Sequence, residues 1–436
     1  MQRWRTLESR AAAPARVFLF ALIVRVAFAW AVPTPPLSGD AVDYDRLARS
    51  IVSGQGYVAP DGLPTSDRPP LYSYFLATAY SLHDNGPALA RGLQAVVDAL
   101  TCVMVYVLAR RHFGVPAARV AAVLAVGSLS LIFATRHLLA ETFAAFFMVA
   151  AVLALDVGLT LWQGRVFVLA GICVGLSTLN KATTLVLPPL LMLPIWLAAG
   201  KKWSPTIRAG VLLLAGFIGV LLPWAIRNYQ VHGELVPVAT QVGYVAYSSY
   251  VPPEGKIFGV YTDDETSIRA KALPEVERSR VFLDATLRHV REHPEELPRL
   301  QLLKFLYFIS PFDWELLGGN GVFNFTYSLT VPFALYGLWL ARAQGWPPVL
   351  LAIPPAFLLL LSFALYGSPR LRVPAEPLMM VFAGAGVVDA WQRTEAHRPA
   401  REVIAACLVV AAFMAYLFSA EVKAFSAQIL RSLGAW

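Results

Sequence analysis

Three aspartates stand close together in the stretch LSGDAVDYDRLARSIVSGQGYV, residues 37–58. They are Asp40, Asp43 and Asp45, and they follow an apolar segment that is long enough to cross a membrane. A carboxylate outside a membrane span can accept a proton from an attacking hydroxyl. It can also stabilise the start of a helix through the helix dipole. These two roles require different surroundings, so the three residues are considered separately.

Asp43 and Asp45 have a structural explanation. The segment DYDRLARSIVSG has helical spacing, with an apolar face made of Tyr44, Leu47, Ala48 and Ile51. Asp43 can cap this helix, and Asp45 can pair with Arg49 four residues later. Asp40 precedes the predicted helix and follows Gly39, where a flexible loop would present it to a substrate. Asp40 is therefore the candidate for chemistry.

A second group of ionisable residues lies at the outer ends of predicted membrane spans, in distant parts of the sequence. The group consists of Asp40, Arg68, Glu141, Lys181, Arg227, Arg370 and Arg372. Cations at one membrane level can hold a lipid-linked phosphate and neutralise the charge that develops on it as a leaving group. Any one of these cations is explained equally well as an anchor at the lipid headgroups. Their convergence predicts a phosphate site.

Membrane helices must position these residues. The chain has 436 residues, of which 57% are hydrophobic and 15% are charged, and its mean hydropathy is +0.57. In soluble domains about a quarter of the residues are charged, so the composition predicts an all-α polytopic membrane protein. The net charge of +8 fits basic cytoplasmic loops, and no nucleic-acid partner is expected.

The apolar runs predict about 11–13 transmembrane helices. The candidate spans are 15–32, 88–109, 117–135, 139–160, 165–180, 182–199, 207–226, 324–342, 348–366, 374–391 and 402–420. The first is interpreted as a retained span and not as a cleaved signal peptide, because it is long and carries Arg25.

Loops rich in Lys and Arg predict the orientation. The segments RRHFGVPAAR, GKKWSPTIR and WQRTEAHRPAR fall on the side of the N-terminus, which the positive-inside rule places in the cytoplasm. We predict three regions. They are an N-terminal membrane module (1–226) that includes a first outer loop (33–87), an outer-face loop cap with an interfacial helix (227–323), and C-terminal membrane helices (324–436).

Two segments do not fit simple spans. RPPLYSYFLATAYSL (68–82) is short and opens with two prolines, and PRLQLLKFLYFISPF (298–312) carries Arg299 and Lys304 on an apolar face. Both are expected to lie at the membrane interface. Whether 298–312 spans the membrane instead is left open; in that case a later basic loop would face outward.

Two charged residues lie inside predicted spans, Arg25 in the first and Asp98 at a similar depth in the second. Charges within a membrane are costly unless they are paired. We therefore predict that Arg25 and Asp98 form an ion pair between neighbouring helices.

Four segments, in order, resemble a known family. They are GDAVDYDRLARSIVSGQGY with the following RPPLYSYFLA, LLPWAIRNYQVHGELVPVATQVGY, KFLYFISPFDWELLGGN and YGSPRLRVPAEPLMM. They are similar to segments of bacterial membrane glycosyltransferases of the protein O-mannosyltransferase type, in the glycosyltransferase C superfamily. This superfamily includes lipid A aminoarabinose transferases and lipopolysaccharide-core sugar transferases. The resemblance runs over most of the chain.

The resemblance implies transfer of a sugar, a hexose or a pentose, from a polyprenyl-phosphate donor to a hydroxyl of a lipid, glycan or protein. Transfer would occur with inversion at the outer face of a bacterial inner membrane, in cell-envelope biosynthesis. The residue that is the catalytic base in relatives aligns with Asp40. The next residue is Ala41, so the second acid of some relatives is absent. Where many relatives have Thr-Arg-Pro, this chain has Asn180-Lys181-Ala182, and a lysine binds phosphate as a point charge.

These considerations predict a role for each candidate residue. Asp40 is the catalytic base, the donor phosphate is bound by Lys181, Arg227, Arg370 and Arg372, and the substrates are oriented by Arg68, Tyr44 and Glu141. No cofactor and no set of metal ligands is expected. Dependence on a divalent metal is left open, because relatives differ.

Two other function classes compete with this prediction. A flippase or exporter of lipid-linked sugars would also need a cationic outer site, but it should have a polar path through the membrane, and the predicted spans are nearly free of charge. If the protein were a non-catalytic scaffold or sensor, Asp40 and the outer cations would have no role. The identity of the sugar stays open. Acceptor choice is expected to reside in 227–298 and in the loop around 314–320.

Overall fold

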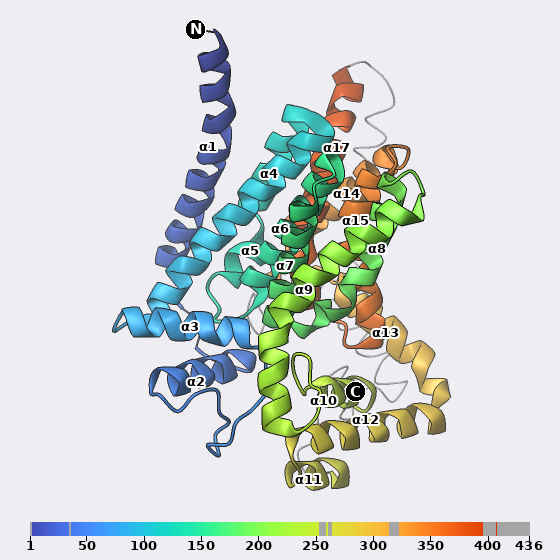
Figure 1. Ribbon diagram of the computed structural model, residues 1–436. Coiled ribbons are helices and arrows are strands. Elements are labelled where there is room, and N and C mark those ends of the chain that lie inside the picture. Colours follow the sequence, from blue (N-terminus) through green and yellow to red (C-terminus); the bar gives the residue numbers. More distant parts are fainter. Residues whose placement is uncertain are drawn as a thin grey trace.

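The membrane part of the chain is a bundle of helices with a layer of shorter helices at one end (Figure 1). This computed structural model describes residues 2–34, 36–252, 259, 264–313, 322–395 and 407. The bundle contains α1 (Gln2–Ala31), α4 (Gly86–Val126), α5 (Leu129–Ala134), α6 (Glu141–Leu161), α7 (Gly164–Asn180), η1 (Ala182–Val186), α8 (Leu187–Ala198), α9 (Trp203–His232), α14 (Phe325–Ala341), α15 (Trp346–Ala364), α16 (Pro369–Arg372), η3 (Val373–Ala375) and α17 (Glu376–Glu395).

Six helical segments of the described chain are long and apolar enough to cross a membrane: Ala12–Ala31, Gly86–Val126, Glu141–Leu161, Trp203–His232, Trp346–Ala364 and Pro369–Arg393. Three shorter apolar segments accompany them: Gly164–Asn180, Ala182–Ala198 and Phe325–Ala341. The prediction of a helical multi-pass membrane protein is confirmed. The predicted last span, 402–420, lies outside the described residues.

Helix α4 is two antiparallel arms and not one straight rod. The Arg25 guanidinium donates from Nε to Asp98 Oδ2 at 2.5 Å and from Nη1 to the Val126 carbonyl oxygen at 2.6 Å. In a straight helix, Asp98 and Val126 would lie about 42 Å apart, so one side chain cannot reach both. The chain reverses at Gly114, whose φ of 82° suits glycine.

The predicted pair of Arg25 and Asp98 is therefore confirmed. The ion pair is completely buried, and Arg25 also donates to the carbonyl oxygen of Ala125 at 3.0 Å. The predicted span 117–135 was wrong as a single helix, because the return arm of α4 ends at Val126 and α5 follows after a turn at Gly127.

Glycines bring α7 and α9 into close contact. A Cβ atom at Gly171 would lie 1.9 Å from the carbonyl oxygen of Leu213, and one at Gly216 would lie 2.2 Å from that of Val168. Small residues allow membrane helices to pack backbone to backbone. This contact holds the end of α7, where Lys181 follows Asn180, at a defined place in the bundle.

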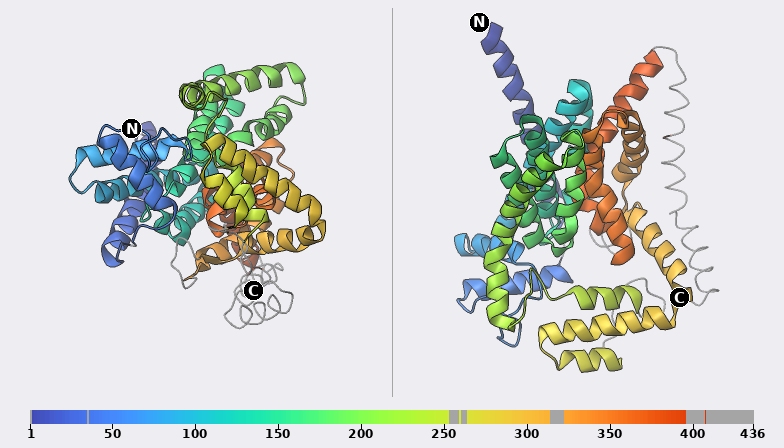
Figure 2. Two further views of the ribbon diagram at one scale, coloured as in Figure 1. Left: turned by 90° about the horizontal axis from the view of Figure 1, so that it is seen from below. Right: turned by 45° about the vertical axis from the view of Figure 1, so that its right-hand side comes forward.

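The layer at one end of the bundle comes from two parts of the chain. It contains α2 (Asp40–Val52), α3 (Pro70–Leu82), α10 (Val242–Tyr250), α11 (Glu265–Lys271), α12 (Glu275–Glu292) and η2 (Pro294–Glu296), and α13 (Leu297–Ile309) leads from it toward the bundle. We call the described residues between the end of α9 (His232) and the end of α13 (Ile309) the cap. Figure 2 shows α2 and α3 beside the cap. Two strands, β1 (Phe312–Asp313) and β2 (Val322–Phe323), form an antiparallel pair after α13.

The two segments predicted to lie at the interface form short helices. α3 and α13 have 13 residues each, which corresponds to about 20 Å and is less than the hydrocarbon thickness of a bilayer. Their lengths favour the interfacial interpretation.

Candidate active site

Helix α2 begins earlier than the sequence pattern suggests. Its first residue is Asp40, and the N-cap is Gly39, with φ 52° and no side-chain capping bond. The predicted flexible loop for Asp40 and the predicted capping role of Asp43 were both wrong. The pairing of Asp45 with Arg49 is confirmed at 2.8 Å. A glycine can adopt the positive φ that turns the chain into the helix here, and the Asp40 carboxylate then lies at the positive end of the helix dipole.

Asp40 forms ion pairs with two arginines from distant segments. Arg370 donates from Nη2 to Asp40 Oδ2 at 2.5 Å, and Arg68 Nη2 lies 2.8 Å from Asp40 Oδ1. The same Arg68 nitrogen lies 2.7 Å from Asp43 Oδ2. Asp43 was missed as a member of this site. The signal was available, because residues three apart share one face of a helix.

The network continues into the bundle through Glu141. Arg370 donates from Nε to Glu141 Oε1 at 2.5 Å, and the Lys181 ammonium donates to the same oxygen at 3.0 Å. Glu141 is the first residue of α6 and is completely buried. Its second oxygen, Oε2, is buried without a hydrogen-bond partner among the described residues. We call Asp40, Asp43, Arg68, Glu141, Lys181 and Arg370 the ion network.

The backbone around each cation explains its direction. Lys181 follows the last residue of α7, where the chain becomes extended. Arg370 lies in the first turn of α16, and the Ser368 hydroxyl accepts a hydrogen bond from its backbone N–H at 3.1 Å. Short turns at helix ends therefore position both cations, as is common for functional residues on rigid scaffolds.

The network keeps Asp40 ionised. Burial raises the pKa of its carboxyl, but the charges of Arg370 and Arg68 outweigh this effect and lower the pKa to about 2. Burial lowers the pKa of the Arg68 guanidinium, but the charges of Asp40 and Asp67 and the hydrogen bond to Asp43 contribute to an overall rise. About 28% of the Asp40 side chain is exposed, so a substrate can reach it.

The aromatic ring of Tyr44 contacts the guanidinium of Arg68. The Arg68 guanidinium lies over the Tyr44 ring, 5.8 Å from its centroid, within the range of cation–π attraction. Tyr44 is only 5% exposed and packs edge-on against Tyr72. Burial raises the pKa of the Tyr44 hydroxyl, so the ring carries no charge and orients Arg68.

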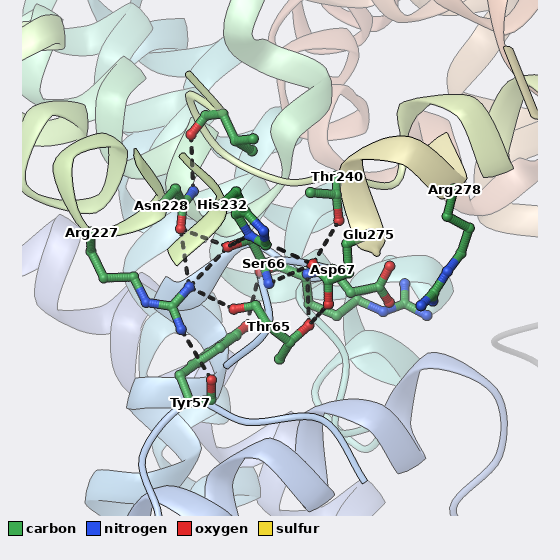
Figure 3. Close-up of polar contacts among 12 residues, drawn as sticks. Tyr57, Thr65, Ser66, Asp67, Arg227, Asn228, His232, Thr240, Glu275 and Arg278 are labelled. Atoms are coloured by element: carbon green, nitrogen blue, oxygen red, sulfur yellow. Dashed lines mark hydrogen bonds and ion pairs between the residues drawn. The ribbon is translucent and has the colours of Figure 1, made fainter. Parts of the chain in front are cut away.

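Two of the predicted phosphate ligands lie elsewhere. Arg372 is 2% exposed, donates to Glu376 at 2.9 Å and to the carbonyl oxygen of Ser310 at 2.7 Å. Residues two apart on a helix point to nearly opposite sides, so Arg370 and Arg372 cannot both face Asp40. Arg227 donates to the backbone carbonyl oxygens of Thr65 and Tyr57 and to the Ser66 hydroxyl (Figure 3).

The ion network does not offer a complete set of ligands for a divalent cation. Its carboxylates are already bound to arginines: Asp40 and Glu141 share Arg370, and Asp40 and Asp43 share Arg68. Across the part of the chain that the structure describes, no group of three or more His, Cys, Asp or Glu side chains has an arrangement that could hold a metal ion.

One part of the chain resembles a known protein family. Residues 67–226 match the family model described as dolichyl-phosphate-mannose-protein mannosyltransferase. This region is therefore similar to that family, and the match covers less than half of the chain. It contains Arg68, Glu141 and Lys181, whereas Asp40 and Arg370 lie outside the matched residues. A search of curated protein sequences found no significant match.

Solved structures show the same fold over nearly the whole chain. The oligosaccharyltransferase AglB of Archaeoglobus fulgidus, in complex with an inhibitory peptide and a dolichol-phosphate, aligns with 99% of this chain and 56% of its own, at 15% identity and a TM-score of 0.56. Its complex with zinc and sulfate aligns with 93% of this chain and 52% of its own, at 16% identity and a TM-score of 0.57. This chain thus spans about half the length of AglB. ArnT of Cupriavidus metallidurans bound to undecaprenyl phosphate aligns with 91% of this chain and 80% of its own, at 16% identity and a TM-score of only 0.40.

Proposed function

We propose that this protein transfers a sugar from a polyprenyl-phosphate donor to a hydroxyl of a lipid, glycan or protein acceptor. The reaction takes place at the end of the bundle that carries the cap, which is the outer face of the membrane. The observation that carries the proposal is the position of Asp40. It is a partly exposed carboxylate that forms ion pairs with Arg68 and Arg370. Arg370 also binds Glu141, and Glu141 in turn binds Lys181.

The chemistry is a single displacement with inversion. The acceptor oxygen forms a bond to the anomeric carbon while the bond from that carbon to the phosphate oxygen breaks. Asp40 takes the proton of the acceptor hydroxyl, and the phosphate leaves with the electron pair. Arg370 and Lys181 neutralise the leaving phosphate. Glu141, which is completely buried, binds both cations and so orients them for the substrate.

The low pKa of Asp40 is consistent with a mechanism in which binding of the donor makes Asp40 more basic. A carboxylate whose pKa is about 2 is ionised but is a weak base at neutral pH. A donor phosphate competes for the charge of Arg370. When Arg370 turns toward the phosphate, the attraction that lowers the pKa of Asp40 weakens, and Asp40 becomes more basic. Donor binding then prepares the base.

Arg227 and Arg372 have no part in this mechanism. Both were predicted to bind phosphate, but their guanidinium groups are bound to backbone carbonyls and neighbouring side chains away from Asp40. Lys181 and Arg370 remain as the phosphate ligands, and Arg68 orients Asp40.

Replacing the base tests the proposal. Asp40→Asn keeps the size of the side chain and removes its capacity to accept a proton, so transfer should fall by about 10²-fold or more. The purified protein is reconstituted in liposomes with radiolabelled undecaprenyl-phosphate sugars, hexoses and pentoses in turn, and with lipid extract as acceptor. Asp45→Asn is the matched control, since Asp45 lies in the same helix but is bound to Arg49 and Tyr80.

Three results are informative. Transfer by the wild type and by the Asp45 variant, but not by the Asp40 variant, supports the proposal. Wild-type turnover in Asp40→Asn refutes the role of Asp40. Movement of the labelled lipid between leaflets without transfer would identify a flippase instead. Mass spectrometry of lipids from a deletion strain, in search of a glycolipid that has lost one sugar, would identify a lipid acceptor.

A further inference from the structure

One glutamate of the cap holds the first outer loop. Glu275, in the first turn of α12, accepts hydrogen bonds from the Thr65 hydroxyl, from the Ser66 backbone N–H at 2.9 Å and from the Thr240 hydroxyl at 3.1 Å. Figure 3 shows the carboxylate among these three groups. Thr65 and Ser66 are buried. Their side chains stand more than 200 positions from Glu275 in the sequence, so only the folded cap brings them together.

The same short segment is held on its other side by α9. The Ser66 hydroxyl lies 2.7 Å from Asn228 Oδ1 and 2.8 Å from Nε2 of His232, and Arg227 donates to it at 2.8 Å. Arg227 also donates to the Thr65 carbonyl oxygen at 2.6 Å. The backbone at 65–66 is thus fixed between a membrane helix and the cap (Figure 3).

This segment leads directly to the candidate active site. Arg68 stands two residues after Ser66 and contacts Asp40 and Asp43. The cap runs alongside, since the Thr240 N–H donates to the Ser66 carbonyl oxygen at 3.0 Å. Gln241 accepts from Arg68 at 3.4 Å and donates to Asp67 at 3.2 Å.

We propose that Glu275 is a positioning residue of the transfer reaction, through which the cap sets Arg68 against Asp40. This inference rests on the proposed function. Arg68 has a long and flexible side chain, and its reach to Asp40 depends on where the backbone at 65–67 lies. Glu275 holds that segment through the Thr65 hydroxyl and the Ser66 backbone N–H, and it joins the segment to the Thr240 hydroxyl of the cap. The cap is therefore part of the catalytic structure and not only a cover over it.

The choice of a carboxylate fits this role. A carboxylate offers several acceptor sites, and the three groups that surround it all donate. Without it, the buried Ser66 N–H loses its partner, which is unfavourable, and the segment gains freedom to move. A glutamine whose carbonyl oxygen takes the place of Oε2 can still accept from the Ser66 N–H and the Thr240 hydroxyl, and the Thr65 hydroxyl can rotate to accept from its amide NH2.

The first experiment compares the kinetics of variants in liposomes with an undecaprenyl-phosphate sugar. Glu275→Ala should lower kcat about tenfold with less than about a twofold change in KM for the donor, because the ligands of the phosphate are untouched. Glu275→Gln should restore most of the loss. Glu277→Ala, an exposed position of the same helix, should match the wild type.

A double-mutant cycle separates positioning from general support of the fold. Arg68→Lys keeps the positive charge. If Glu275 acts through Arg68, adding Glu275→Ala to Arg68→Lys causes little further loss, so the effects are not additive. Fully additive losses, or equal kcat for Glu275→Ala and wild type, overturn the proposal.

Hydrogen–deuterium exchange tests the inference without any substrate. In Glu275→Ala, amides at 57–70 and in the first turn of α2 should exchange faster than in wild type and in Glu277→Ala. Unchanged exchange in both regions overturns the proposal. An inactive wild type with faster exchange in Glu275→Ala would refute the proposed function and still support the positioning of Arg68 by the cap.

Discussion

Arg370 and Asp40 stand 330 positions apart in the sequence, and their side chains form an ion pair of 2.5 Å. Arg370 also binds Glu141 through a different nitrogen. One guanidinium thereby joins the first outer loop to the start of α6. Its planar fork suits this bridge, since each N–H donates in a fixed direction.

Arg370 should be needed to bind the donor phosphate. Arg370→Ala should weaken the binding of undecaprenyl phosphate about tenfold or more, because a charge-assisted hydrogen bond is lost. Arg370→Lys should have an intermediate effect, since an ammonium keeps the charge but not the fork. Binding is measured by the quenching of intrinsic fluorescence in detergent. Arg342→Ala, at the end of α14, is the control, and equal affinity in Arg370→Ala would rule out the phosphate role.

Replacing Arg25 should destabilise the protein more than replacing Asp98, its partner in the buried ion pair. Arg25→Leu leaves Asp98 buried without a counter-ion and should lower the free energy of unfolding by about 3–5 kcal/mol. Asp98→Asn should cost less, because Arg25 still donates to the carbonyl oxygens of Ala125 and Val126. Thermal unfolding in detergent measures both. Equal losses would show that these carbonyl bonds contribute nothing.

Close packing of α7 and α9 should not tolerate a single methyl group at the contact. Gly171→Ala should destabilise the protein by about 1–3 kcal/mol, because the new Cβ meets the Leu213 backbone. Gly219→Ala, on α9, is the matched control. A Cβ there has no atom within 4 Å, and alanine is the better helix former. Similar melting temperatures for the two variants would contradict the packing argument.

Lys304 should reduce stability at neutral pH. Its side chain is completely buried, its ammonium lies 3.5 Å from the centroid of the Tyr250 ring, and no hydrogen-bond partner is found among the described residues. Burial lowers its pKa to about 7 from 10.5. The unfolded chain therefore binds more protons than the native protein between these values, so stability should rise as pH increases from 7 to 10.

Replacing Lys304 tests whether its buried amine destabilises the protein at neutral pH. Lys304→Met keeps the length of the side chain and should stabilise the protein by about 2–4 kcal/mol at pH 7, with less gain at pH 10. Melting temperatures at the two pH values provide the measurement. A destabilised variant at pH 7 would mean that the ammonium has a favourable partner.

The sequence was sufficient to predict a helical multi-pass membrane protein and the ion pair inside it. Apolar length determines which segments can span a bilayer, and the predicted spans from 15–32 to 374–391 correspond to helices of the structure, apart from the division of 117–135. The desolvation cost of a charge in lipid requires a partner, which is why Arg25 and Asp98 could be paired from their depth alone.

Only the tertiary structure decided which cations face Asp40. A position along an apolar run defines how deep a residue lies, but not the direction in which its side chain points around the helix axis. Arg370 and Arg372 share one depth and face opposite sides, and Arg227 is turned toward the backbone of the first outer loop. Likewise, no pattern in the sequence predicts the hydrogen bonds that Glu275 accepts from Thr65 and Ser66. Such contacts depend on how helices rotate and pack against one another, and packing is a property of the whole fold.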